Sequence, residues 1–237
     1  MKQPKNSAIG RRQFLAATSG LLAVTVPGAE MIAHAANTEG PLPSFPAPKP
    51  AGNLHKIPIG VFDPVYEHLS LDAMLDKVSA LSLEAMEIGT GGYPNNPHCP
   101  LDDLIDDRGK AKAWMKKFED RGIRVATLSC HGNPIHPDPK HAQRDIDTFH
   151  KTVLLAEILD VKVIVGFSGC PGGTPQDTQP NWITYRWPPE YAKMQDWQWK
   201  EKVVPYWKDA AKFAREHGVK RLALEMHPNF EIGRAHV

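Results

Sequence analysis

Short apolar runs alternate with amphipathic helical stretches along most of this chain, and that alternation restricts the fold more than any other feature. Five runs have the length and composition of buried strands, at residues 57–62, 85–88, 124–130, 161–167 and 222–224. Between them, apolar residues recur at the three- and four-residue spacing of helices. Nearly uninterrupted apolar strands are typical of sheets covered on both faces. The sequence therefore predicts an α/β fold with a parallel sheet.

The predicted helices lie between these strands. Ser70 can cap the first, the second covers residues 102–121 and ends at Gly122, the third includes residues 142–156, and the fourth ends at Gly218. Residues 168–191, rich in Gly, Pro and Trp, are expected to form a long loop. Residues 89–93 follow a strand but lack the GxGxxG spacing of a nucleotide site, so either a tight loop beside a ligand or a plain turn is expected.

Polar residues come at the end of every predicted strand. They are Asp63, Glu87 with the Gly-rich turn after it, His131, Ser168 and Glu225. An open doubly wound sheet and a (β/α)8 barrel both fit the order of elements. The one-sided pattern favours the barrel, whose sites lie at the carboxyl ends of the strands.

The last strand carries the clearest chemistry. Glu225 and His227 follow the apolar run and lie on the same side of an alternating backbone, and Pro228 ends the strand. A carboxylate and an imidazole at the mouth of a buried strand suit metal binding or acid–base catalysis. A solvated Glu and a His packed on the proline would also fit this pattern.

Charge and cysteine content exclude some classes of function. The formal net charge of +1 argues against a nucleic-acid or membrane surface. Cys99, Cys130 and Cys170 lack CxxC spacing, so no zinc framework is expected. The sequence does not indicate an oligomeric state.

The N-terminal residues predict export. Arg11 and Arg12 precede an Ala/Leu-rich apolar run and a small-x-small cleavage pattern, which resembles a twin-arginine signal peptide over residues 1–35. An uncleaved anchor is the alternative. Residues 36–55 form a Pro-rich linker, and the globular domain is expected from residue 56. We therefore expect the twin-arginine export machinery as a partner and a periplasmic or secreted location.

Three motifs resemble the xylose-isomerase-like TIM barrel superfamily, in its sugar phosphate isomerase/epimerase branch. They are Ala85-Met-Glu-Ile-Gly-Thr-Gly-Gly-Tyr93, Ser129-Cys-His-Gly-Asn-Pro134 and Leu222-Ala-Leu-Glu-Met-His-Pro228. The resemblance implies that Glu225 binds a divalent metal and moves a proton on the sugar. It also implies that His131 lines the sugar site. Glu87 and His227 are further predicted substrate-binding residues.

The family's other metal ligands come from strands six to eight. This chain ends soon after its fifth predicted strand, so a partial barrel of about five β/α units over residues 56–230 is expected. Residues 231–237 resemble a translated sequencing adapter and are expected to be a non-native tail. We therefore expect the natural gene to continue and this chain to be C-terminally truncated.

The resemblance implies a metal-dependent sugar isomerase or epimerase that moves a proton next to a carbonyl. Hard oxygen ligands and an imidazole suit Mg, Mn, Co or Zn without distinguishing them. A metal-dependent lyase or hydrolase of keto-sugars or glycosides and a non-catalytic periplasmic sugar-binding protein remain alternatives. An abasic-site endonuclease is a further alternative that the resemblance allows, although the near-neutral charge and the export signal weigh against it. The aromatic residues Tyr185, Trp187 and Trp197 are candidates to stack on a sugar or to pack the long loop.

Overall fold

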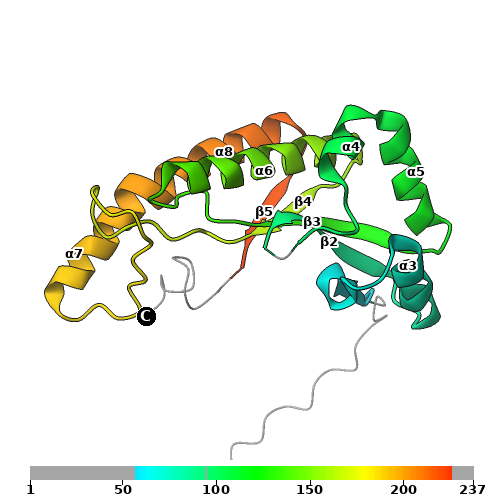
Figure 1. Ribbon diagram of the computed structural model, residues 1–237, viewed down its shortest axis with the longest axis horizontal. Coiled ribbons are helices and arrows are strands. Elements are labelled where there is room, and N and C mark those ends of the chain that lie inside the picture. The colour runs from blue at the N-terminus through cyan, green and yellow to red at the C-terminus, as the bar shows by residue number, and fades with distance from the viewer. Residues whose placement is uncertain (1–56, 94, 226–237) are drawn as a thin grey trace, which may run out of the picture. The chain divides into compact units, whose positions relative to one another are not determined.

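A computed structural model of the protein describes residues 57–93 and 95–225, and these residues carry a parallel sheet (Figure 1). Its five strands are β1 (Gly60–Phe62), β2 (Ala85–Gly92), β3 (Arg124–His131), β4 (Val163–Gly166) and β5 (Arg221–Leu224). Every strand lies beside the one that precedes it in the chain, and every pairing is parallel. In a doubly wound sheet the order of the strands would reverse partway across the sheet, although the strands stay parallel. The predicted α/β class is confirmed, and the sequential order is consistent with a partial TIM barrel.

Helices connect the strands. They are η1 (Asp63–Tyr66, a 3-10 turn), α3 (Leu71–Ala80), α4 (Leu101–Asp106), α5 (Arg108–Glu119), α6 (Pro139–Ile158), α7 (Pro189–Gln198), the π-helical turn η2 (Trp199–Val203) and α8 (Val204–Glu216). Ser70 caps α3 as predicted, because its hydroxyl accepts from the amide of Ala73. Within the described ranges, none of these helices has the length and apolar character of a membrane span.

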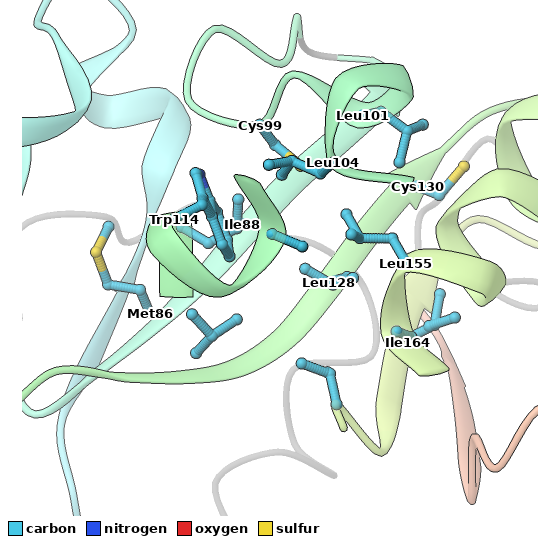
Figure 2. Packing of buried hydrophobic residues seen from close by; sticks show 14 of the residues in the cluster. Met86, Ile88, Cys99, Leu101, Leu104, Trp114, Leu128, Cys130, Leu155 and Ile164 are labelled. Atoms are coloured by element: carbon cyan, nitrogen blue, oxygen red, sulfur yellow. The ribbon is translucent and has the colours of Figure 1, made fainter. Parts of the chain in front are cut away.

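The core lies between the sheet and the helices that cover one face of it (Figure 2). Met86, Ile88 and Leu128 point from the strands into this layer and are fully buried. Trp114 and Phe118 of α5 pack there with ring centroids 4.5 Å apart. Burying side chains of this size contributes about 1.5–3 kcal/mol each, so this layer holds the strand ends in place. Residues that alternate with the core positions, such as Glu87 and Ala223, face the other side of the sheet.

The glycine-rich stretch after Ile88 is part of β2 and not the predicted loop. Gly91 and Gly92 pair with Cys130 and His131 across a register shift in the ladder. A Cβ at Gly92 would lie 2.2 Å from the carbonyl oxygen of His131, and its φ is +84°. Glycine is needed here for close backbone approach, which a strand can use as well as a turn.

Two helix predictions also need correction. The expected helix over residues 102–121 is divided at Asp107, whose backbone is extended and whose carboxylate accepts from the amides of Gly109 and Lys110 to cap α5. The expected loop over residues 168–191 ends at Pro189, where α7 begins. Proline is favoured at the first position of a helix, so this start could have been found in the sequence.

The signal peptide (1–35), the linker (36–55), His227 and the tail (231–237) lie outside the described residues.

Candidate functional site

His131 ends β3 and lies inside an aromatic enclosure. Its ring centroid is 4.6 Å from that of Phe167, after β4, and 5.7 Å from that of Phe62, in β1. Only 4% of the residue is exposed. The backbone is held as well, because the amide of Tyr93 donates to the His131 carbonyl over 2.6 Å. His131 therefore lies at the carboxyl edge of the sheet, where the sequence placed it.

Glu225 lies beside His131 although 94 positions separate them in the chain. The backbone amide of Glu225 donates to the carbonyl of Gly166 over 2.8 Å and continues the β4–β5 ladder. Its Oε2 is 3.3 Å from Nε2 of His131, a distance within ion-pair range. That nitrogen has no well-directed hydrogen bond to any described residue. Burial lowers the pKa of His131, and the Glu225 carboxylate opposes that shift. His131 is therefore a buried imidazole that favours its neutral form.

Glu87 adds a second carboxylate to this edge. Burial raises its pKa, a hydrogen bond from Ser129 opposes the shift, and the charges of Glu225 and Asp63 raise the pKa further. The carboxylate of Glu225 therefore lies near enough to act on Glu87, and a cation between the two would relieve the repulsion. The structure thus brings together three of the four predicted site residues, Glu87, His131 and Glu225.

Asp63 has a different role from the one that its strand-end position indicates. It is fully buried, its Oδ2 lies 2.8 Å from Nδ1 of His98, and its Oδ1 accepts from the amide of Gly89 over 2.8 Å. The other nitrogen of His98 lies 3.1 Å from the carbonyl oxygen of Leu69. Because every polar atom of this pair has a partner, the pair fixes β1 against β2. Nothing in the spacing of the two residues reveals it.

The turn after His131 rests on Asp145 of α6. The Asp145 carboxylate is 3% exposed and accepts from the amide of Asn133 over 2.7 Å. Asn133 in turn exchanges two hydrogen bonds with the backbone of Cys170 in the loop after β4, at 2.8 and 2.9 Å. Sequence reasoning missed Asp145, because a single acid inside an amphipathic helix looks like a solvated residue. Asp145 thus anchors the turn after β3, and Asn133 in that turn links it to the loop after β4.

A cavity of about 490 Å³ opens beside His131. Its lining includes the aromatic residues Tyr93, Phe167 and Trp182 and the charged residues Arg144 and Asp145. Tyr185 and Trp187, which the sequence made candidates for sugar stacking, do not line this cavity and are about two-thirds exposed. Trp197 lies on α7 and lines a different cavity. The aromatic residues that line this cavity are therefore Tyr93, Phe167 and Trp182, and not the predicted ones.

The residues at this edge are suited in part to a divalent cation. Carboxylate oxygens from Glu225 and Glu87 and the imidazole of His131 are chemically suitable donors. Within residues 57–93 and 95–225, however, no group of three or more His, Cys, Asp or Glu side chains is arranged to hold a metal ion. The described residues supply only part of a possible metal site.

Comparisons with known proteins give a family. The model of the xylose isomerase-like TIM barrel family matches residues 75–235, well over half of the chain. The uncharacterized protein YfiH of Bacillus subtilis is 38% identical over 161 residues, which cover 67% of this chain and 51% of YfiH. The chain thus spans about half the length of this curated relative.

Solved structures of low sequence identity resemble the chain weakly. A putative xylose isomerase from Rhodospirillum rubrum has a TM-score of 0.49 at 14% sequence identity. The matched region covers 73% of this chain and 56% of the Rhodospirillum chain. A D-tagatose 3-epimerase-like protein has a TM-score of 0.48 at 18% identity, covering 73% and 54%. The IolI protein with a bound zinc atom has a TM-score of 0.45 at 19% identity, covering 74% and 54%.

The family match and the order of the strands agree, since a barrel of this type places each strand beside its predecessor. The chain belongs to the xylose isomerase-like TIM barrel family.

Proposed function

We propose that the complete protein is a metal-dependent sugar isomerase or epimerase, in which Glu225 moves a proton next to a carbonyl. The observation that carries this proposal is the meeting of Glu225 and His131 at the carboxyl edge of the sheet, 3.3 Å apart. Barrels place their sites at this edge. The family model that matches the chain is named for xylose isomerase, and solved structures weakly similar to the chain include a D-psicose 3-epimerase and a putative xylose isomerase.

Glu225 is the residue best placed to exchange a proton. Half of its side chain is exposed, so a substrate can reach it, while its backbone is fixed in the β4–β5 ladder. A carboxylate can take a proton from a carbon next to a carbonyl and return it to the same or the neighbouring carbon. That is the step shared by isomerisation and epimerisation.

His131 and Glu87 support that carboxylate. His131 is buried, favours its neutral form and contacts Oε2 of Glu225, so it limits the orientations that the carboxylate adopts. Glu87 brings a second carboxyl group to the same edge. Glu225 and Glu87 would hold a divalent cation together with ligands outside the described residues, and such a cation, when bound, polarises adjacent sugar oxygens.

The test is Glu225→Gln in the protein encoded by the complete gene. The substitution keeps the shape of the side chain and removes its charge. We expect solvent deuterium incorporation next to the carbonyl of the substrate to fall about 10²–10⁴-fold, the usual contribution of a general base. The bound divalent metal, measured by elemental analysis, should fall in parallel.

Glu119→Gln is the matched control, because Glu119 is an exposed glutamate at the end of α5. It should change neither quantity. Unchanged deuterium exchange in Glu225→Gln would remove Glu225 from the reaction. If the protein releases a sugar from a glycoside without any deuterium exchange, it is a lyase or hydrolase and the isomerase proposal is wrong.

A further inference from the structure

The cavity beside His131 has an aromatic outer part. Tyr93 is 74% exposed and Trp182 is 41% exposed, whereas His131 is 4% exposed. The two outer aromatic residues come from different loops, Tyr93 directly after β2 and Trp182 in the long loop after β4. The cavity therefore runs from a buried end at His131 to an aromatic end at the solvent. Its volume of about 490 Å³ lies in the range of sites that enclose small-molecule ligands.

The charged groups of the cavity compensate one another. Arg144 is the one Lys or Arg among the residues that line it, and its Nε donates to Oδ1 of Asp145 over 3.0 Å. Nη2 of Arg144 lies 2.8 Å from Nε2 of His141, which is itself 3.1 Å from Oδ2 of Asp145. The guanidinium is thus opposed by a buried carboxylate at close range. The cavity offers hydrogen-bond donors without an excess of positive charge.

His136 in this wall adds little cationic character, because burial and the neighbouring His141 lower its pKa. The rings of His136 and His141 stack with centroids 4.0 Å apart, at an interplanar angle of 8°. Nδ1 of His136 accepts a hydrogen bond from the amide of Asp138, which leaves Nε2 as the nitrogen that carries the proton of the neutral ring. A phosphate group carries a charge of about −1.5 to −2 at neutral pH. Binding it here would leave most of that charge uncompensated.

We propose that this cavity binds a neutral carbohydrate of more than one ring, such as a glycoside or disaccharide, in preference to a sugar phosphate. One ring lies at the buried end near His131, and the next lies against the aromatic faces of Tyr93 and Trp182. Stacking needs only an apolar ring face, and the hydroxyl groups of the sugar match the paired polar side chains. This inference rests on the proposed function for the identity of the ligand as a sugar.

The experiment measures binding to the complete protein by isothermal titration calorimetry. The probes are cellobiose, maltose and lactose, with glucose and glucose 6-phosphate as comparisons. At least one disaccharide should bind about tenfold more tightly than glucose, and glucose 6-phosphate should bind no more tightly than glucose. Tyr93→Ala and Trp182→Ala should each weaken disaccharide binding about 3- to 10-fold, as expected for the loss of one stacked ring. Trp182→Phe should keep most of the affinity.

Tyr185→Ala and Trp187→Ala are the matched controls, because these aromatic residues are exposed on the same loop but do not line the cavity. They should leave affinity unchanged. Equal losses in the controls, tighter binding of glucose 6-phosphate than of every disaccharide, or binding of none of the probes would each overturn the proposal. Thermal melting of each variant separates lost binding from lost folding. Calorimetry measures binding without turnover, so the two proposals can fail separately. Disaccharide binding without proton exchange would contradict the isomerase proposal and would support the disaccharide site.

Discussion

At the scale of single residues, buried polar groups fix the candidate site more than the exposed ones do. Asp145 accepts hydrogen bonds from the amide of Asn133 and from Nε of Arg144, and its Oδ2 lies 3.1 Å from Nε2 of His141. One carboxylate thus holds a turn and neutralises a guanidinium. Removing one partner from a buried network leaves the others unsatisfied, which costs more than the net contribution of each bond. The turn that follows His131 therefore depends on a side chain from another element.

Asp145→Asn tests this dependence. The amide group presents a donor where the carboxylate accepted, so we expect a loss of about 1–3 kcal/mol in the free energy of unfolding, measured by urea denaturation. Asp147→Asn changes an exposed position of the same helix, where Oδ1 of Asp147 accepts from Gln143, and should change stability by less than about 0.5 kcal/mol. Equal losses in both variants would show that the network around Asn133 does not carry the effect.

At the scale of elements, the carboxyl end of β2 is formed by close backbone contact. Gly92 lies against His131 in the neighbouring strand, and a side chain has no room there. Because β3 carries His131, the spacing between these two strands sets where the imidazole lies.

Gly92→Ala should therefore disturb both stability and the site. The added Cβ would meet the carbonyl of His131 at 2.2 Å, and the positive φ adds strain. We expect a loss of about 2–4 kcal/mol from overpacking and backbone strain together, measured by chemical denaturation. Gly122→Ala is the matched control, since Gly122 also has a positive φ of +69° but nothing lies within 4 Å of its Cβ position. It should lose only about 1–2 kcal/mol from the left-handed conformation.

The strands, most helices and the edge that carries Glu225 could be predicted from the sequence, because apolar periodicity and strand-end polar residues are local signals. The extension of β2 could not, since a glycine-rich run looks the same in a turn and in a close strand contact. The break at Asp107 was missed because the apolar spacing continues across it. Asp145 and Trp182 reach the cavity only through the packing of α6 and of the long loop, which no local pattern records.

At the scale of the whole molecule, the edge of β5 opposite β4 has the largest effect on whether the described residues self-associate. Among the residues that the structure describes, β5 pairs only with β4, and Trp207, Val203 and Leu224 line an apolar cavity of about 400 Å³ next to it. An apolar strand edge of this kind is a template for pairing with another chain.

Residues 56–225 expressed alone should therefore self-associate, as sedimentation velocity would show. Ala223→Lys places a charge at an exposed position of β5 and should reduce the association severalfold. Ala80→Lys adds the same charge at an exposed position at the end of α3 and should not. A monodisperse, cooperatively melting wild-type segment would contradict this expectation.

The export proposal concerns the whole precursor. Replacing Arg11 and Arg12 together by lysine keeps the charge of the N-terminal region but removes the arginine pair. We expect the precursor to remain in the cytoplasm, as fractionation and immunoblotting of cells would show. Lys2 and Lys5 replaced by arginine serve as the control and should be exported normally. Periplasmic delivery of the Arg-to-Lys double variant would reject the twin-arginine assignment.

The sequential strand order also has a consequence in time. Because each strand pairs with the one before it, every new strand that leaves the ribosome meets a partner that has already been synthesised. Each addition closes only the segment between two consecutive strands, such as the one between β2 and β3. The sheet can thus grow in the direction of translation, and His131 is in place on β3 before Glu225 arrives on β5.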